Sequence, residues 1–244
     1  MPTEVSLPPF GCSAPRVLND QNRFDDDRLI HTQMETAIEL FHRPPQNCRV
    51  FNLLLGSPDV VLFGTNQRQT LWAEGLDTLA RKHKVLIVVS ADNNSRVHAN
   101  TPADAEAVLQ NYPQYLFDPE CALSDPATSA IALTVGSISQ FAAIAIRAGT
   151  RPCDFARAVA GVNQPSSFTC VGPGINRAIK PELVYNGGNL LFEGVGNQYR
   201  RVRTENPDAG VAVMSLSHQP LDTLFSFRVG TSQAPARRRH WLRG

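Results

Sequence analysis

Two apolar runs separated by a helical segment constrain the fold of this chain more than any other feature. Residues 49–56 form a short, nearly continuous apolar run that ends at glycine, and residues 84–90 form a second, stronger one. Between them, residues 70–82 carry an apolar stripe at helical spacing: Leu71, Trp72, Leu76 and Leu79. Short continuous apolar runs are typical of strands buried on both faces. Strand, helix and strand with short connections predict a right-handed βαβ unit and a parallel sheet.

The rest of the chain continues this alternation of helices and strands. We expect a helix that is capped by Asp25, Asp26 or Asp27 and stops at Pro44, a helix at 102–110, and strands at 130–138, 183–185, 211–216 and 224–229, the last two antiparallel. The segment 149–177 is rich in Gly, Pro, Ser and Asn and predicts long surface loops. These elements predict a single α/β domain over residues 1–244, with ligands at the carboxyl ends of the parallel strands.

Composition excludes several classes of function. The formal net charge is +1, so no overall field attracts nucleic acid or a membrane surface. No apolar run approaches the roughly 18 residues of a membrane span, and Met1 to Pro9 do not have the pattern of a secretory signal. The five cysteines are scattered without a C-x-x-C pair, which argues against a zinc site, and free thiols favour the cytoplasm. We expect no metal and no cofactor.

Two polar segments stand at places where chemistry could occur. Gly230-Thr231-Ser232 follows an apolar strand and precedes a potential helix, a geometry that presents a serine oxygen as a nucleophile. Ala91-Asp92-Asn93 follows the strongest strand, where an asparagine amide can donate to an oxyanion, although on this loop alone we favour a simple Asx turn. The glycines at 172–174 and 187–188 do not form a phosphate-binding pattern after a strand.

Taken together, five segments in order resemble the subtilisin-like serine proteases (subtilases). In family motif notation they match the N-x-S-L-G strand, the strand that ends in A-G-N, the PA…VGA segment, the KPdlvApG segment and G-T-S-x-A-x-P. The matching residues here are 50–56, 87–94, 125–136, 180–188 and 230–235. Five ordered motifs are far more specific than any one of them. The resemblance covers residues 12–235.

The resemblance implies a three-layer sandwich around a mostly parallel sheet. It makes Ser232 the nucleophile and Asn93 the oxyanion donor. The backbone of Leu54, Leu55 and Gly56 would then pair with an extended peptide substrate by strand addition. A serine hydroxyl needs a base, and the family uses a histidine held by an aspartate.

Departures from the family pattern predict that this chain alone is inactive. None of the six histidines is followed by glycine, and neither the D-[ST]-G nor the H-G-T motif of the family occurs. We therefore expect a partial domain that begins downstream of both residues and is incomplete at both ends of the fold. Leu54 stands in place of the serine of N-x-S-L-G, and Asp92 in place of the glycine of A-G-N.

The last residues also depart from the family. Residues 236–244 are strongly basic, whereas the family continues with a long buried helix, and successive arginines cannot enter a core unpaired. A nucleic-acid-binding tail is one interpretation. A one-nucleotide frameshift is the one we favour, because a shifted reading of compatible codons encodes Pro-Arg-Val-Ala-Gly-Ile.

Three functions remain open at this stage. The first is a serine endopeptidase in a truncated, inactive form. The second is a non-catalytic pseudo-protease that binds peptides, or a fragment that complements a separately supplied N-terminal fragment. The third, a nucleotide-binding domain, requires a glycine-rich phosphate loop after the first strand, which is not found.

Overall fold

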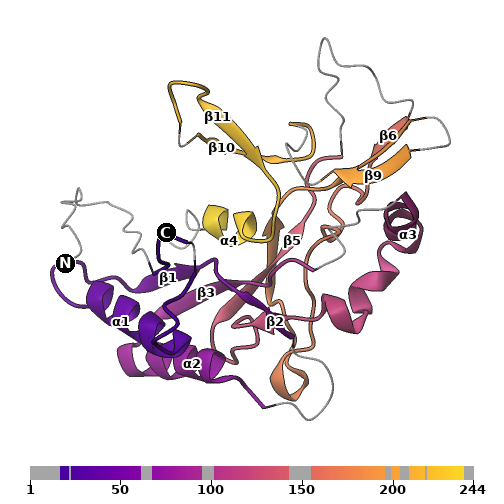
Figure 1. Ribbon diagram of the computed structural model, residues 1–244. Coiled ribbons are helices and arrows are strands. Elements are labelled where there is room, and N and C mark those ends of the chain that lie inside the picture. The colour runs from indigo at the N-terminus through magenta and orange to yellow at the C-terminus, as the bar shows by residue number, and fades with distance from the viewer. Residues whose placement is uncertain are drawn as a thin grey trace.

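A four-stranded parallel sheet forms the centre of the molecule (Figure 1). The computed structural model describes residues 17–21, 23–61, 68–94, 102–142, 155–195, 199–203, 209–217 and 219–238. The sheet has the order β1-β3-β5-β7, with strands Val50–Leu53, Leu86–Ser90, Leu133–Ile138 and Leu183–Asn186. All three pairings are parallel. The predicted βαβ unit and parallel sheet are therefore confirmed.

Helices α1 (Ile30–His42) and α2 (Leu71–His83) cover one face of this sheet. Met34 and Ile38 of α1 pack against Ile87 and Val89 of β3 in a single buried core, together with three residues of the predicted stripe of α2: Trp72, Leu76 and Leu79. The fourth, Leu71, is exposed. Helix α2 begins as its sequence predicts: the side chain of Thr70 accepts a hydrogen bond from the backbone N–H of Ala73 at 3.1 Å.

The start of α1 differs from the prediction. Its N-cap is Leu29, which makes no side-chain cap, so an aspartate cap was wrong. The buried Gln33 replaces it: its Nε2 atom donates to the backbone oxygens of Asp25 and Arg28 at 2.9 and 2.7 Å. The side chain of Gln33, a residue inside α1, therefore binds the loop that precedes the helix. Asp25, Asp26 and Asp27 do not cap the helix.

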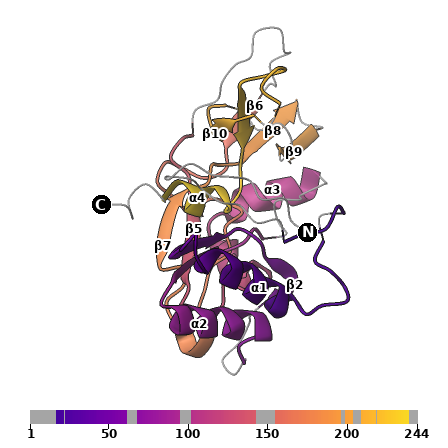
Figure 2. The same cartoon turned by 90° about the vertical axis from the view of Figure 1, so that its left-hand side faces the viewer.

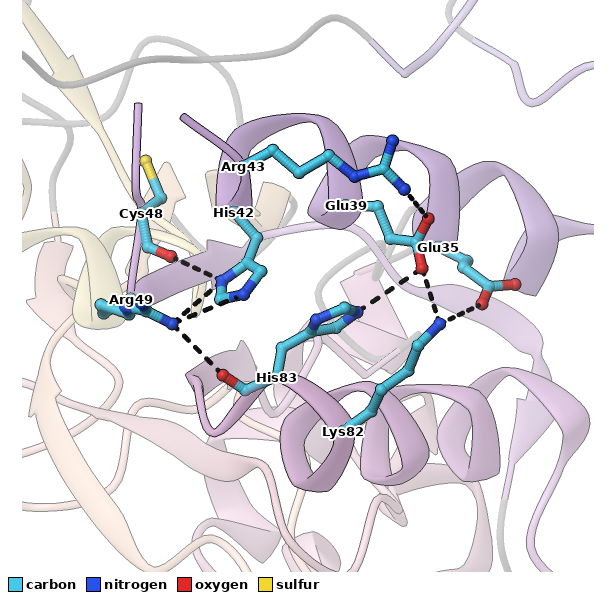
Figure 3. Close-up of polar contacts among 8 residues, drawn as sticks. All are labelled: Glu35, Glu39, His42, Arg43, Cys48, Arg49, Lys82 and His83. Carbon is cyan, nitrogen blue, oxygen red and sulfur yellow. Dashed lines mark hydrogen bonds and ion pairs between the residues drawn. The ribbon is translucent and has the colours of Figure 1, made fainter. Parts of the chain in front are cut away.

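Polar contacts join the ends of α1 and α2 to the beginning of β1 (Figure 3). Glu39 of α1 receives Lys82 of α2 at 2.7 Å and Arg43 at 3.0 Å. The rings of His42 and His83 lie 4.5 Å apart, and Arg49 donates to the backbone oxygen of His83 at 3.4 Å. These contacts fix the helix layer beside the edge strand.

The opposite face of the sheet carries the short helix α4 (Gln233–Arg238), so the sheet lies between two helical layers (Figure 2). Ala234 is fully buried and packs against Val88 and Val135. Since Val88 alternates with Ile87 and Val89 along β3, this second core lies on the other side of the sheet. The predicted three-layer arrangement is confirmed. Residues 239–244, the rest of the predicted basic tail, lie outside the described residues.

A second group of elements packs beside the sheet. Strands β6 (Phe155–Ala158), β8 (Leu191–Val195) and β9 (Tyr199–Arg203) form an antiparallel sheet, which contacts helix α3 (Pro102–Asn111). Phe168 and Phe192 are almost completely buried in the core between them. Three 3-10 helices lie in the connections that the structure describes: Gln114–Phe117, Pro119–Cys121 and Ile175–Arg177.

Two smaller strand pairs flank the main sheet. Strand β2 (Ser57–Val61) pairs with β4 (Ser124–Asp125), and β10 (Val213–Leu216) pairs with β11 (Phe225–Arg228). Both pairs are antiparallel, which confirms the predicted hairpin at the C-terminal end. The β10–β11 hairpin projects beyond the sheet in Figure 1.

The prediction of surface loops over 149–177 is wrong for most of the described part. Phe155 to Ala158 form a strand, and Ser166, Ser167, Phe168, Thr169 and Cys170 are buried. The hydroxyl groups of Ser166 and Thr169 have partners inside the protein: Ser166 Oγ donates to the backbone oxygen of Gly188 at 2.6 Å, and Thr169 Oγ1 accepts the N–H of Ser137 at 3.0 Å. Polar composition suggested exposure, but internal hydrogen bonds make burial favourable.

None of the helices in the described part of the chain is long and apolar enough to cross a membrane.

Candidate active site

Ser232 lies where the chain turns from β11 into α4, as its sequence context predicts. The turn depends on Gly230, whose φ of 148° is a backbone conformation that residues with a side chain rarely adopt. The N–H of Gly230 donates to the backbone oxygen of Gly187 at 2.9 Å. A Cβ on Gly187 would lie 2.2 Å from Oγ of Ser137 and 2.7 Å from the oxygen of Gly230. The serine turn is thus held against the carboxyl ends of β5 and β7.

Thr231 joins this turn to the end of β3. Its backbone N–H donates to Oδ1 of Asn93 at 2.9 Å. Its buried hydroxyl lies 2.9 Å from both Oδ1 of Asn93 and the backbone oxygen of Asp92. Because Oδ1 accepts from Thr231, the Nδ2 group of Asn93 is the end of the amide that can donate to a ligand.

The segment proposed to bind substrate also lies close to Ser232. The hydroxyl of Ser232 is 3.5 Å from the backbone oxygen of Leu54. Leu54 to Gly56 connect β1 to β2, and Leu54 and Gly56 are exposed. The structure therefore brings together all the residues that the sequence singled out: Ser232, Asn93, Leu54, Leu55 and Gly56.

Asp92 has an unusual conformation at this junction. Its φ is 75°, which accords with the glycine that the family motif places at this position. Its own side chain stabilises the turn: Oδ1 accepts the N–H of Asn93 at 2.7 Å, and Oδ2 accepts the Ser124 hydroxyl at 2.5 Å. Sequence reasoning noted this residue only as a departure from a motif and did not identify its carboxylate as part of the site.

A general base beside Ser232 is not found among the described residues. The backbone oxygen of Leu54 is the only hydrogen-bond partner that its hydroxyl has there. His31 and His42 lie on α1 and His83 at the end of α2, in the helix layer across the sheet from α4. His98, His218 and His240 lie outside the described residues.

The buried ionisable groups around the site make hydrogen bonds and an ion pair that stabilise the fold. Burial raises the pKa of Asp125, and its carboxyl accepts the Thr70 hydroxyl at 2.5 Å. Lys180 is buried and donates to the backbone oxygen of Ala132 at 2.7 Å, beside the Glu182 carboxylate at 2.6 Å. Burial, together with the nearby Asp92 and Cys121, raises the pKa of the Cys170 thiol, so it is a poor nucleophile.

No group of three or more His, Cys, Asp or Glu side chains that could hold a metal ion occurs among the described residues.

Comparison with known proteins relates this chain to one family and to two individual proteins. The sequence model of the subtilase family matches residues 14–237. The uncharacterized protein y4bN of Sinorhizobium fredii (strain NBRC 101917 / NGR234) is 36% identical over 207 residues, which cover 84% of this chain and 45% of that protein. The chain thus spans less than half the length of that relative. Among solved structures, the prenylagaramide maturation protease PagA aligns with 85% of this chain and 46% of its own, at 14% identity and a TM-score of 0.37.

The family match covers most of the chain, and it includes the Asn93 and Ser232 segments that the fold brings into contact. This chain belongs to the subtilase family of serine proteases.

Proposed function

We propose that this chain carries the nucleophile, the oxyanion donor and part of the peptide cleft of a serine endopeptidase. The observation that carries the proposal is the contact between Thr231 and Asn93, two residues 138 positions apart in the chain. The contact supports the proposal because it joins Asn93 to the residue before Ser232, whose hydroxyl lies 3.5 Å from the backbone oxygen of the exposed Leu54.

Each of these groups has a separate part in peptide-bond hydrolysis. The substrate backbone would lie along Leu54 to Gly56, and Oγ of Ser232 would attack the carbonyl carbon. Negative charge would then develop on the carbonyl oxygen, where Nδ2 of Asn93 donates a hydrogen bond. Removal of one such donor in a serine protease costs about 3–4 kcal/mol of transition-state stabilisation.

A base that could remove the Ser232 proton is not found among the residues that the structure describes. Without it the hydroxyl is a weak nucleophile, so we propose that this chain alone hydrolyses peptides slowly or not at all. Oxyanion stabilisation and substrate binding do not require the base.

A fluorescein-labelled tetrapeptide boronic acid tests the proposed site. The serine oxygen adds to boron, the hydroxyl proton passes to solvent, and the product resembles the tetrahedral intermediate. We expect saturable binding by fluorescence anisotropy that is lost in Ser232→Ala and kept in Ser226→Ala, a serine of β11 that serves as the matched control. Equal binding by wild type and Ser232→Ala would refute the proposed site.

A fluorophosphonate probe tests the proposed inactivity separately. Because this probe needs an activated serine, we expect less than stoichiometric labelling of Ser232 after a reaction time that saturates an intact serine protease. Rapid stoichiometric labelling would show that a base is present.

A second function, complementation by another chain, is favoured by the open edge of the sheet. Within the described residues β1 pairs only with β3, so its other edge is free. A parallel strand added there would end beside Leu54 and Ser232, where a base is needed. We expect co-expression with a fragment that carries D-[ST]-G and H-G-T to restore proteolysis of casein, and to fail with Ser232→Ala. If peptides bind but no such fragment restores cleavage, a peptide-binding pseudo-protease becomes the better description.

A further inference from the structure

The carboxylate of Asp92 lies between the two chain segments that would flank a bound peptide. A Cβ built on Gly56 would lie 2.8 Å from Oδ2 of Asp92, and 3.3 Å from the backbone oxygen of Asp125. Asp92 itself immediately precedes Asn93, whose N–H it binds at 2.7 Å. The carboxylate therefore spans the distance from the oxyanion donor to the last residue of the cleft segment.

The course of a substrate past these residues follows from the proposed function, on which this inference rests. The reacting carbonyl lies between Oγ of Ser232 and Nδ2 of Asn93, and the chain that precedes it runs along Leu54 to Gly56. On that course the side chain of the residue that supplies this carbonyl would lie beside segments 54–56 and 91–93, where the Asp92 carboxylate is close to Gly56 and Asp92 is partly exposed.

The charge of this carboxylate is not neutralised by the part of the chain that the structure describes. Its two hydrogen-bond donors are the N–H of Asn93 and the hydroxyl of Ser124, both of them neutral. None of the ion pairs among the described residues includes Asp92. The neighbouring carboxyl of Asp125 is buried against Thr70, and Asp125 approaches Gly56 through its backbone oxygen.

We infer that Asp92 is a specificity-determining residue that selects a basic side chain, arginine or lysine, at the residue that supplies the reacting carbonyl. A guanidinium or ammonium group satisfies both features of the site. It pairs with the uncompensated carboxylate through a charge-assisted hydrogen bond, and it can also donate to the backbone oxygen of Asp125. An acidic side chain at the same position meets like charge.

Two peptide boronic acids that differ only in charge test this inference. Fluorescein-Ala-Ala-Ala-boroarginine and its citrulline counterpart have the same shape, but only the first is cationic. At low salt we expect the wild-type chain to bind the arginine compound about tenfold more tightly, a difference of about 1.4 kcal/mol. The preference is expected to shrink as salt rises, because Asp92 is partly exposed.

Variants of Asp92 separate charge from shape. Asp92→Asn keeps an acceptor for the Asn93 N–H and tolerates the positive φ, so we expect citrulline affinity within twofold of wild type and an arginine-to-citrulline ratio near one. Asp92→Gly is expected to give the same ratio. The control Glu74→Gln, which changes net charge equally on the exposed surface of α2, is expected to keep the tenfold preference.

Other outcomes overturn the inference in recognisable ways. If both compounds bind equally well to the wild-type chain and depend on Ser232, the proposed function stands and the role of Asp92 is wrong. If Asp92→Gly binds both compounds more tightly than wild type, and to the same degree, the Asp92 side chain obstructs binding and does not select a basic side chain. If neither compound binds in a manner that depends on Ser232, the proposed function fails and this inference fails with it.

Discussion

At the scale of single residues, the site depends on one threonine that acts through its neighbour. The hydroxyl of Thr231 is completely buried and touches both Asp92 and Asn93. Threonine and valine have nearly the same shape, so Thr231→Val removes the hydroxyl contacts with little change in packing. The backbone hydrogen bond to Asn93 remains in this variant.

We predict that Thr231→Val weakens binding of the peptide boronic acid by about three- to tenfold. The reason is that a hydrogen bond of this kind contributes about 0.5–1.5 kcal/mol, and its loss lets the Asn93 amide rotate away from the oxyanion position. Fluorescence anisotropy measures the change. Thr223→Val is the matched control, because its hydroxyl contacts only the exposed hairpin, and unchanged affinity in both variants would contradict the prediction.

The sequence could predict which residues meet at this site but not how they are held. Ser232 and Asn93 were predicted from motifs, and the structure brings them together, while their roles stay predictions. The position of the Asp92 carboxylate depends on a positive φ and on the approach of Gly56, a residue 36 positions earlier in the chain. Local pattern carries no information about such an approach.

At the scale of secondary structure, a buried aspartate ties α2 to the loop that enters β5. Asp77 accepts hydrogen bonds from Gln69, Ser129 and the backbone N–H groups of Ala130 and Ile131, at 2.6, 2.5, 3.0 and 2.9 Å. Burial alone would raise the pKa of Asp77, but the hydrogen bonds outweigh burial and lower it.

We predict that Asp77→Asn lowers the free energy of unfolding by roughly 1–3 kcal/mol at neutral pH, because an amide cannot accept all four bonds. A carboxyl group whose pKa is lower in the folded state stabilises the protein above its unfolded pKa, and this contribution disappears as the pH falls through the folded pKa. The difference between variant and wild type is therefore expected to shrink below about pH 4. Urea denaturation at several pH values measures it, with Glu74→Gln as the surface control; a constant difference at every pH would contradict the assignment.

Some elements of the fold were predictable because their signals are local. Helix α2 has a threonine cap and a regular apolar stripe, and β3 is a continuous apolar run. Strand β9 has neither signal: three of its five residues are arginine, and its place is fixed by the pairing of Leu191 to Val195 with Tyr199 to Arg203. A strand of this kind forms because it pairs with a neighbouring strand, and its own sequence does not reveal that pairing.

At the scale of the whole molecule, one apolar surface lacks cover in the part of the chain that the structure describes. On the β10–β11 hairpin, Met214 pairs with Phe227 and Leu216 with Phe225, so all four side chains lie on one face. Met214, Leu216 and Phe225 are 50%, 78% and 47% exposed. Exposed apolar surface of this kind promotes association between chains.

We predict that the chain self-associates through this face at micromolar concentrations and that a paired substitution prevents it. Leu216→Lys with Phe225→Glu places opposite charges directly across the hairpin, which keeps the strand pairing while removing the apolar face. Sedimentation velocity at increasing concentration is the measurement. The control is Val162→Lys, which changes an exposed apolar residue outside the hairpin and is expected to leave association unchanged. If the paired variant associates as strongly as wild type, self-association uses another surface and the prediction is wrong.

The general architecture could also be predicted at this scale, since alternating helices and apolar strands led to the three-layer sheet that the structure shows. The antiparallel sheet of β6, β8 and β9 could not. It forms around Phe168 and Phe192, which lie in segments without any regular periodicity.

The hydrogen bond between Thr231 and Asn93 has a consequence for the moment at which the site comes into existence. The two residues are 138 positions apart, and the strands β5 and β7 that hold the serine turn lie between them in the chain. During synthesis, at about 5–20 residues per second, Asn93 therefore leaves the ribosome several seconds or more before Ser232. The contact that joins the two segments can form only after almost the whole chain has been made, so the proposed site is among the last parts of the molecule to assemble.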